Sequence, residues 1–281
     1  MSDIFERTRV PRHHRTDSIA ELGEWYTWSS PFLRALTGTK SLIEKLPIPQ
    51  VVSVKGCVPY DASYTYRLSD LSNLIAAFTL EASEALLRAR VDRTLRLFCD
   101  MLRPSISSLV LHKIFALLRC GIAALQGDSR AALHSPLAPK RVDDGFRLHS
   151  DLFIVDHICL IFDDVGRGQS GKSVFLPTDI LRRLIQTNNL IPPEIRSRIG
   201  SLLRGEILYD AFDECYDLLY SRKHLWTASL SNSIEQRQMT IKLKRGEGYL
   251  LNDRHWLHGR LPVEGRVSPS RFRRLVYGLP R

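Results

Sequence analysis

A run near the middle of the chain matches a pattern by which many proteins hold phosphate. Residues 163–177, DDVGRGQSGKSVFLP, place Gly166, Gly171, Lys172 and Ser173 at the positions of G-x-x-x-x-G-K-[ST]. This chemistry needs a helix that begins at the Gly-Lys-Ser, because the free N–H groups of the first turn hold the phosphate. A nucleotide hydrolase is therefore one hypothesis, and it depends on a helix at this point.

The residues after Ser173 do not favour that helix. They are Val174, Phe175, Leu176 and Pro177. In a helix, Pro177 could not bond the carbonyl of Ser173 and its ring would clash there, at a cost of about 3 kcal/mol or more. A β-branched and aromatic stretch that ends in proline predicts a strand instead. We also find no obvious acidic strand downstream that could hold magnesium.

A histidine and an aspartate lie upstream of this loop at a spacing suited to metal binding. They are His149 and Asp151, in the segment LHSDLF. Two residues apart on an extended strand, both side chains point to the same face and can hold one metal ion. The segment GYLLNDRHWLHGR offers a second histidine, His255 or His258. Two histidines and one carboxylate form the facial triad of non-haem Fe(II) sites, which leaves three coordination positions open.

Taken in this order, the motifs resemble a known family. From about Phe146 to Tyr277 the chain resembles the Fe(II)/2-oxoglutarate-dependent dioxygenases, in particular the branch of taurine dioxygenase and clavaminate synthase. The resemblance rests on HSD in a strand, on SGKS before a strand and a helix, and on NDRHWLHGR followed by SRFRRLVYG. Residues 1–140 show no comparable match. The resemblance implies a hydroxylase that uses Fe(II), O2 and 2-oxoglutarate and releases succinate and CO2.

The resemblance also implies which residues bind the iron. They would be His149, Asp151 and His258, which are then the catalytic residues. His258 is preferred over His255 because Gly259-Arg260 follows it, as in the family's HGR. Asp151 implies hydroxylation or a related oxidation, because related halogenases carry Gly or Ala at this position. The substrate would be a small molecule, and an anionic one is compatible with the basic chain.

The co-substrate needs partners of its own. The planar fork of an arginine can meet the distal carboxylate of 2-oxoglutarate at two points, which a lysine does not reproduce. Strand alternation puts Arg271 and Arg273 on one face, with Phe272 and Arg274 on the other. The resemblance favours Arg271 as the anchor, with Arg273 as the alternative. It also assigns Ser173 as a contact of 2-oxoglutarate, so that the Gly-Lys-Ser run becomes a turn beside the co-substrate.

The elements that must position these residues indicate an α+β protein with a mostly antiparallel sheet or barrel. We expect a disordered tail at 1–18 and one domain at 19–281, whose part 19–140 is mainly helical, with helices between about 68 and 125 and a loop near 126–145. Strands are expected within 146–176 and 224–278. Three helices are expected within 177–220, as an insert that serves partly as a lid. The resemblance implies a double-stranded β-helix (jelly-roll, cupin-like) core with flanking helices.

The net charge and the distribution of arginines indicate which classes of molecule the protein could bind. The formal net charge of the 281 residues is +10, and residues 254–281 hold seven Arg against one Glu. An excess of this sign suits an anionic substrate or nucleic acid. Aromatic residues do not interleave with the arginines, so a stacking groove for nucleic acid is not indicated. A basic nucleic-acid-binding protein is therefore only an alternative function.

The cysteines and the apolar segments indicate in which cellular compartment the protein is expected. The five cysteines are scattered, with no C-x-x-C, which suits buried thiols in a reducing compartment. The most apolar long run, residues 106–125, is interrupted by His112, Lys113 and Arg119, and this predicts a buried helix rather than a membrane span. The charges at the N-terminus are not followed by the apolar core of a secretory signal. We expect a cytoplasmic protein with no membrane partner.

Overall fold

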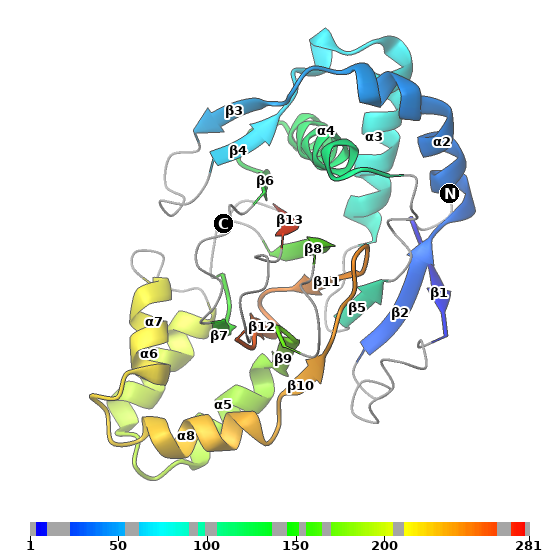
Figure 1. The fold of residues 1–281 in the computed structure, drawn as a ribbon. Helices are drawn as coiled ribbons and strands as arrows, with labels where there is room; N and C mark the ends of the chain where they lie inside the picture. Colours follow the sequence, from blue (N-terminus) through cyan, green and yellow to red (C-terminus); the bar gives the residue numbers. More distant parts are fainter. Residues whose placement is uncertain are drawn as a thin grey trace.

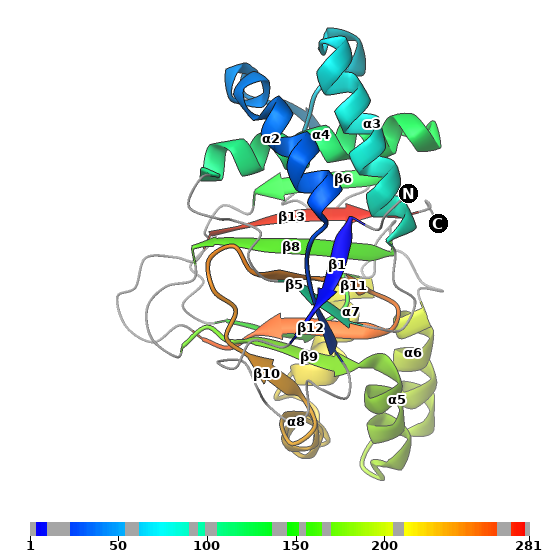
Figure 2. The same cartoon turned by 90° about the vertical axis from the view of Figure 1, so that its right-hand side faces the viewer.

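Two sheets lie between two groups of helices, so that the molecule has four layers (Figures 1 and 2). The computed structural model describes residues 4–9, 23–53, 62–89, 95–98, 106–136, 145–151, 156–164, 170–204, 211–262 and 271–278. One group of helices covers the outer face of the larger sheet, and the other covers the outer face of the smaller sheet (Figure 2). The architecture is mixed α+β, as the sequence predicted.

The larger sheet has seven strands in the order β1-β2-β5-β11-β8-β13-β6. Their bounds are β1 Phe5–Thr8, β2 Gly23–Trp28, β5 Leu95–Phe98, β11 Gly248–Asn252, β8 His157–Asp164, β13 Arg271–Tyr277 and β6 Ala132–Pro136. Neighbours are antiparallel except β2 and β5, which are parallel. The register between β13 and β8 shifts between Arg271 and Phe272.

The smaller sheet has four antiparallel strands in the order β10-β9-β12-β7. Their bounds are β10 Met239–Ile241, β9 Ser173–Pro177, β12 Trp256–Arg260 and β7 Phe146–His149. In this sheet His258 of β12 stands opposite His149 of β7 and Phe175 of β9. A separate pair joins β3 (Gln50–Ser53) to β4 (Ala62–Thr65). The ladder therefore places two histidines, distant in sequence, side by side.

The helices form two groups, which come from different parts of the chain. The group on the larger sheet is α2 (Ser30–Lys45), α3 (Asn73–Arg88) and α4 (Ser108–Gln126), with a short 3-10 turn, η2, at Leu68–Asp70. The group on the smaller sheet is α5 (Thr178–Thr187), α6 (Pro193–Arg204), α7 (Ala211–Tyr220) and α8 (Thr227–Glu235). The three helices expected within 177–220 are confirmed, and α8 is a fourth that follows them.

The apolar helix α4 lies inside the protein. Within the described residues it is the one helix long and apolar enough to cross a membrane, and 72% of its apolar window is buried. Its charged residues have partners: Lys113 Nζ donates to the carbonyls of Glu44 and Leu46, at 2.7 and 2.6 Å. Arg119 Nη2 donates to the carbonyl of Ser129 at 2.8 Å. The predicted buried helix is therefore confirmed.

Strand alternation divides the apolar side chains among three cores. One core joins α2–α4 to the larger sheet and includes Ile161, Leu275 and Tyr277. A second joins α5–α8 to the smaller sheet and includes Val174 and Leu257. The third lies between the sheets and includes Leu160, Phe162, Phe175, Tyr249, Trp256 and Val276. From Phe272 to Tyr277 the even-numbered residues of β13 thus face the other sheet and the odd-numbered ones face the helices.

Four local expectations were wrong. Residues 5–8, placed in a disordered tail, form β1; residues 95–98, expected to be helical, form β5; residues 132–136, expected in a loop, form β6; and residues 227–235, expected among strands, form α8. The three strands are short. β5 and β6 pair with strands distant in sequence, and β1 pairs with the next strand, β2, across more than a dozen residues. Local composition does not carry that information, because strand propensity depends on the neighbours.

Candidate metal centre

His149, Asp151 and His258 come together between the two sheets. His149 ends β7, Asp151 follows two residues later, and His258 lies in β12. One ligand atom from each residue lies within 4.8 Å of the others, and the two imidazole centroids are 4.6 Å apart. His255, the other candidate, lies in the turn before β12 and is outside this cluster. The sequence motifs therefore converge on one site.

Hydrogen bonds orient both imidazoles so that one nitrogen of each faces the cluster. Nδ1 of His149 donates to the carbonyl of Arg147 at 2.7 Å, and a neutral ring then keeps a lone pair on Nε2. Nε2 of His149 is 3.6 Å from Oδ1 of Asp151. Nδ1 of His258 is 3.0 Å from the hydroxyl of Tyr249, and its buried Nε2 has no hydrogen-bond partner within the described chain. A metal ion would supply the partner that this nitrogen lacks.

The charges of the site suit a divalent cation. Burial alone would raise the pKa of Asp151, but Arg274 and the two histidines outweigh it and hold that pKa below the usual value. Nη1 of Arg274 donates to Oδ2 of Asp151 at 2.8 Å. Burial, followed by the proximity of His149, lowers the pKa of His258 to about 3. At neutral pH Asp151 is thus ionised and His258 is neutral, the protonation states that metal binding requires.

Gly259 lets the two ligand-bearing strands approach each other. A Cβ at this position would lie 2.6 Å from the carbonyl oxygen of Phe146 and 2.9 Å from the carbonyl carbon of Arg147. Both contacts are with the backbone of β7, which cannot move without shifting His149. Position 259 therefore requires glycine for a steric reason, because any side chain there would push β7 away from β12.

The arginines of β13 differ from the sequence expectation. Arg274, expected to face away, reaches Asp151. Arg273, the alternative anchor, lies on the side of the helices, where its Nε is 2.8 Å from Oδ2 of Asp163 and its Nη2 donates to Ser108 at 2.8 Å. Arg273 and Arg274 lie on opposite faces of β13, as strand alternation predicted, but the face of Arg274 is the one turned toward the metal cluster. The side chain of Arg271, the favoured anchor, lies outside the described part of the chain.

The Gly-Lys-Ser run leads into a strand. Ser173 begins β9, and the next helix, α5, begins only at Thr178. Gly171 has φ +65° and donates its N–H to the carbonyl of Pro262, so it forms a turn. The helix that a phosphate loop needs is not there, and the nucleotide hydrolase is not favoured. Ser173 is buried and stands opposite Arg260 of β12 in the ladder.

Sequence reasoning missed Asp253, in the turn between β11 and β12. Its carboxylate accepts a hydrogen bond from the Ser150 hydroxyl at 2.7 Å and one from the Asp151 N–H at 3.1 Å. The side chain is almost completely buried, with 1% exposed. The segment NDRH marks a turn, but no spacing in the sequence connects Asp253 with Ser150. Only the fold brings the two together.

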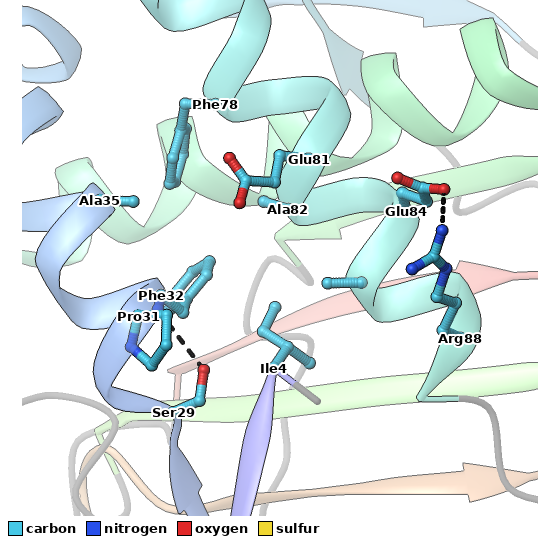
Figure 3. Close-up of a pocket in the computed structure, with 11 residues that line it drawn as sticks. Ile4, Ser29, Pro31, Phe32, Ala35, Phe78, Glu81, Ala82, Glu84 and Arg88 are labelled. Atoms are coloured by element: carbon cyan, nitrogen blue, oxygen red, sulfur yellow. Dashed lines mark hydrogen bonds and ion pairs between the residues drawn. The ribbon is translucent and has the colours of Figure 1, made fainter. Parts of the chain in front are cut away.

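A pocket of about 300 Å3 lies elsewhere, between α2 and α3 (Figure 3). Its walls include Ile4, Phe32 and Phe78, and the carboxylate of Glu81 points into it in Figure 3. Nearby, Arg88 forms an ion pair with Glu84. None of the metal-centre residues lines this pocket. It is therefore separate from the candidate site.

Comparison with known proteins gives a distant structural likeness. No family model and no curated protein matches the chain. A solved structure of asparagine oxygenase in complex with Fe(II), 2S,3S-3-hydroxyasparagine and succinate is 11% identical, with a TM-score of 0.48, and 90% of this chain covers 93% of that one. The non-heme iron oxygenase OrfP in complex with Fe is 12% identical, with a TM-score of 0.46 and coverages of 91% and 93%. A likeness this distant carries no conclusion about what the present chain binds.

Proposed function

We propose that the protein is an Fe(II)/2-oxoglutarate-dependent oxygenase that hydroxylates a C–H bond of a small molecule. The observation that carries the proposal is the cluster of His149, Asp151 and His258, with ligand atoms within 4.8 Å of one another. Two imidazoles and one carboxylate are the donor set of non-haem Fe(II) sites that keep positions open for co-substrate and O2. Bound Fe(II) with 2-oxoglutarate and O2 would supply the oxidation, with succinate and CO2 as co-products.

The proposal includes a jelly-roll core in a single domain at 19–281. Two facing sheets with almost entirely antiparallel pairing, and a site between them, support this topology. The helices α5–α8 pack on the outer face of the smaller sheet, and the end of this group beside β7 would serve partly as a lid at the mouth of the site. Tyr220 of α7 donates its hydroxyl to the carbonyl of Leu148 at 2.6 Å, and its ring lies under the guanidinium of Arg147, at 5.1 Å. These contacts connect the helices to the strand that ends at His149.

Each ligand has a partner that orients it toward the metal. Arg274 holds Oδ2 of Asp151, which leaves Oδ1 on the side of His149 for the ion. The Tyr249 hydroxyl holds Nδ1 of His258. Burial, with the nearby Asp151 charge, raises the pKa of Tyr249. Its neutral hydroxyl oxygen would accept from the protonated Nδ1 of His258, which leaves the lone pair of Nε2 for the metal. Partners of this kind set the tautomer and direction of a ligand and strengthen metal binding.

Carboxylates of the co-substrate would meet arginines in the space between the sheets. The fork of Arg274 has donors beyond the one that holds Asp151, so it can also meet a carboxylate bound beside the metal. Arg271 remains the proposed anchor of the distal carboxylate, with Ser173 as a second contact. Arg260 and Arg274 are both more than four-fifths buried. Beside a bound dication, these two arginines would favour an anionic small-molecule substrate.

The compartment is part of the proposal. Cys120, Cys159 and Cys215 are buried free thiols. Burial raises the pKa of each of them, which keeps them protonated and inert. A reducing compartment such as the cytoplasm suits this state.

The test begins with metal binding. We expect Mn(II), a redox-silent substitute for Fe(II), to bind one site per chain, and we expect Asp151→Ala and His258→Ala each to abolish binding. His255→Ala is the matched control, because this histidine contacts the fold through its backbone N–H and carbonyl. Succinate release from 2-oxoglutarate with Fe(II), screened against a panel of metabolites, would then identify the activity. Binding that survives His258→Ala but is lost on His255→Ala would overturn the ligand assignment.

A further inference from the structure

We infer that Asp253 is a positioning residue, which holds the His149–Asp151 segment in register with the strand that carries His258. The inference rests on the proposed metal site. Asp253 lies five residues before His258, in the turn between β11 and β12. Through Ser150 and Asp151 it connects this turn to the chain that leaves β7.

The need for such a contact comes from where β7 ends. The ladder between β7 and β12 ends at His149, which stands opposite His258, and β7 itself ends there. Asp151 therefore follows the strand without a ladder partner to fix its position. The two oxygens of Asp253 supply two contacts instead: Oδ1 accepts from the Asp151 N–H at 3.1 Å, and Oδ2 accepts from the Ser150 hydroxyl at 2.7 Å. Asp151, which lies just outside the β7–β12 ladder, is thereby held through its own backbone N–H and through the side chain of its neighbour Ser150.

Asp253 is itself held from two directions. Its N–H donates to the carbonyl of Asp156 at 2.7 Å, and its own carbonyl lies 3.0 Å from the Ser150 hydroxyl. Oδ1 of Asp253 is 4.0 Å from Nε2 of His258, so its charge also lies beside the place where a cation would bind. A buried carboxylate next to a dication is stabilised by it, and this adds to the reason for keeping Asp253 charged.

Replacing Asp253 by asparagine tests its hydrogen bonds while the size and shape of the side chain stay the same. Asp253→Asn keeps the shape but has only one accepting oxygen. Either the Asp151 N–H loses its acceptor, or the amide NH2 faces Ser150 and leaves that hydroxyl only the backbone carbonyl of residue 253, at 3.0 Å. Loss of a partner that orients a ligand typically lowers metal affinity by about 10–100-fold. We expect a loss of this size for Asp253→Asn. For Ser150→Ala, which removes one of the two contacts, we expect a smaller loss of a few-fold.

The experiment measures Mn(II) affinity of the full chain by titration, together with the urea unfolding midpoint of the metal-free protein. The variants are Asp253→Asn, Ser150→Ala and the double variant, with Asp179→Asn as a control whose carboxylate is 71% exposed and contacts Arg182 on the surface of α5. If both residues act through one contact, the double variant should lose less than the product of the two single losses. The control should bind Mn(II) like the parent.

The outcomes separate this inference from the proposed function. A parent protein that does not bind Mn(II) would overturn both. If the parent binds but Asp253→Asn binds equally well, only the positioning role is wrong. A lower unfolding midpoint with unchanged affinity would make Asp253 purely structural, and complete loss equal to that of Asp151→Ala would make it a ligand. If Asp253→Asn fails to fold, Ser150→Ala decides: a few-fold loss of affinity supports the inference and an unchanged affinity overturns it.

Discussion

Removing the guanidinium of Arg274 should destabilise the metal-free protein through Asp151. Nη1 of Arg274 is 2.8 Å from Oδ2 of Asp151, and the two side chains are only 12% and 7% exposed. Arg274→Ala would leave a buried carboxylate without its cation. Breaking a buried pair in this way costs about 3–5 kcal/mol. We expect the lower part of this range, because some water reaches the arginine.

Two further variants calibrate this magnitude. Arg274→Lys keeps the charge but loses the planar fork, so its cost should be smaller than that of alanine. Arg254→Ala removes an ion pair of similar length, 2.7 Å to Asp156, in which the arginine is 47% exposed. Water screens such a pair, and its loss should cost at most about 1 kcal/mol. Distance is thus nearly constant between the two pairs while burial differs.

Urea unfolding at neutral pH, followed by circular dichroism, measures these free energies for the parent and each variant. A second series with saturating Mn(II) tests the role of the carboxylate, because the dication would replace the guanidinium as its partner and reduce the deficit of Arg274→Ala. The reasoning is refuted if Arg274→Ala costs no more than Arg254→Ala, or if Mn(II) leaves its deficit unchanged.

Three other predictions follow from the site and its surroundings. Gly259→Ala should weaken Mn(II) binding about tenfold or more, measured by titration, because its Cβ would displace β7 and with it His149. Lys172→Ala should leave the Michaelis constant for 2-oxoglutarate within a few-fold of the parent. Ser173→Ala should raise that constant, because it removes a hydrogen bond to a charged group, worth about 1.5–3 kcal/mol. Specific ATP binding that is lost on Lys172→Ala would contradict this interpretation of the loop. Burial lowers the pKa of His112 to about 4, so the unfolded chain binds more protons below the usual histidine pKa. The free energy of unfolding should therefore fall as pH drops from about 6.5 to 4, by up to about 3 kcal/mol, and urea unfolding of His112→Asn at several pH values should show a shallower fall.

Local patterns predicted most elements of the C-terminal half. Runs of β-branched and aromatic residues bounded by turn formers became β7–β13, and the three amphipathic segments between them became α5, α6 and α7. The N-terminal half was predicted less well, because β1, β5 and β6 are short strands. Their stability comes from the neighbouring strands of the larger sheet rather than from their own composition.

The amino-acid sequence by itself determined the chemistry of the candidate site. The spacing of His149 and Asp151 already indicated an imidazole and a carboxylate on one strand face, and the family resemblance favoured His258 over His255 as the second histidine. Pro177 already argued against a phosphate-binding helix. These inferences hold because the period of a strand and the constraint of a proline ring are local properties.

Only the tertiary structure decided which partners meet these ligands. The packing of the two sheets against each other turned the face of β13 that carries Arg274, rather than the face of Arg273, toward Asp151. The fold also brought Asp253 to Ser150, which is 103 residues away in the sequence. A local pattern records which face a side chain occupies within its own strand. It cannot record what stands opposite, because that depends on strand pairing and sheet packing formed between distant segments of the chain.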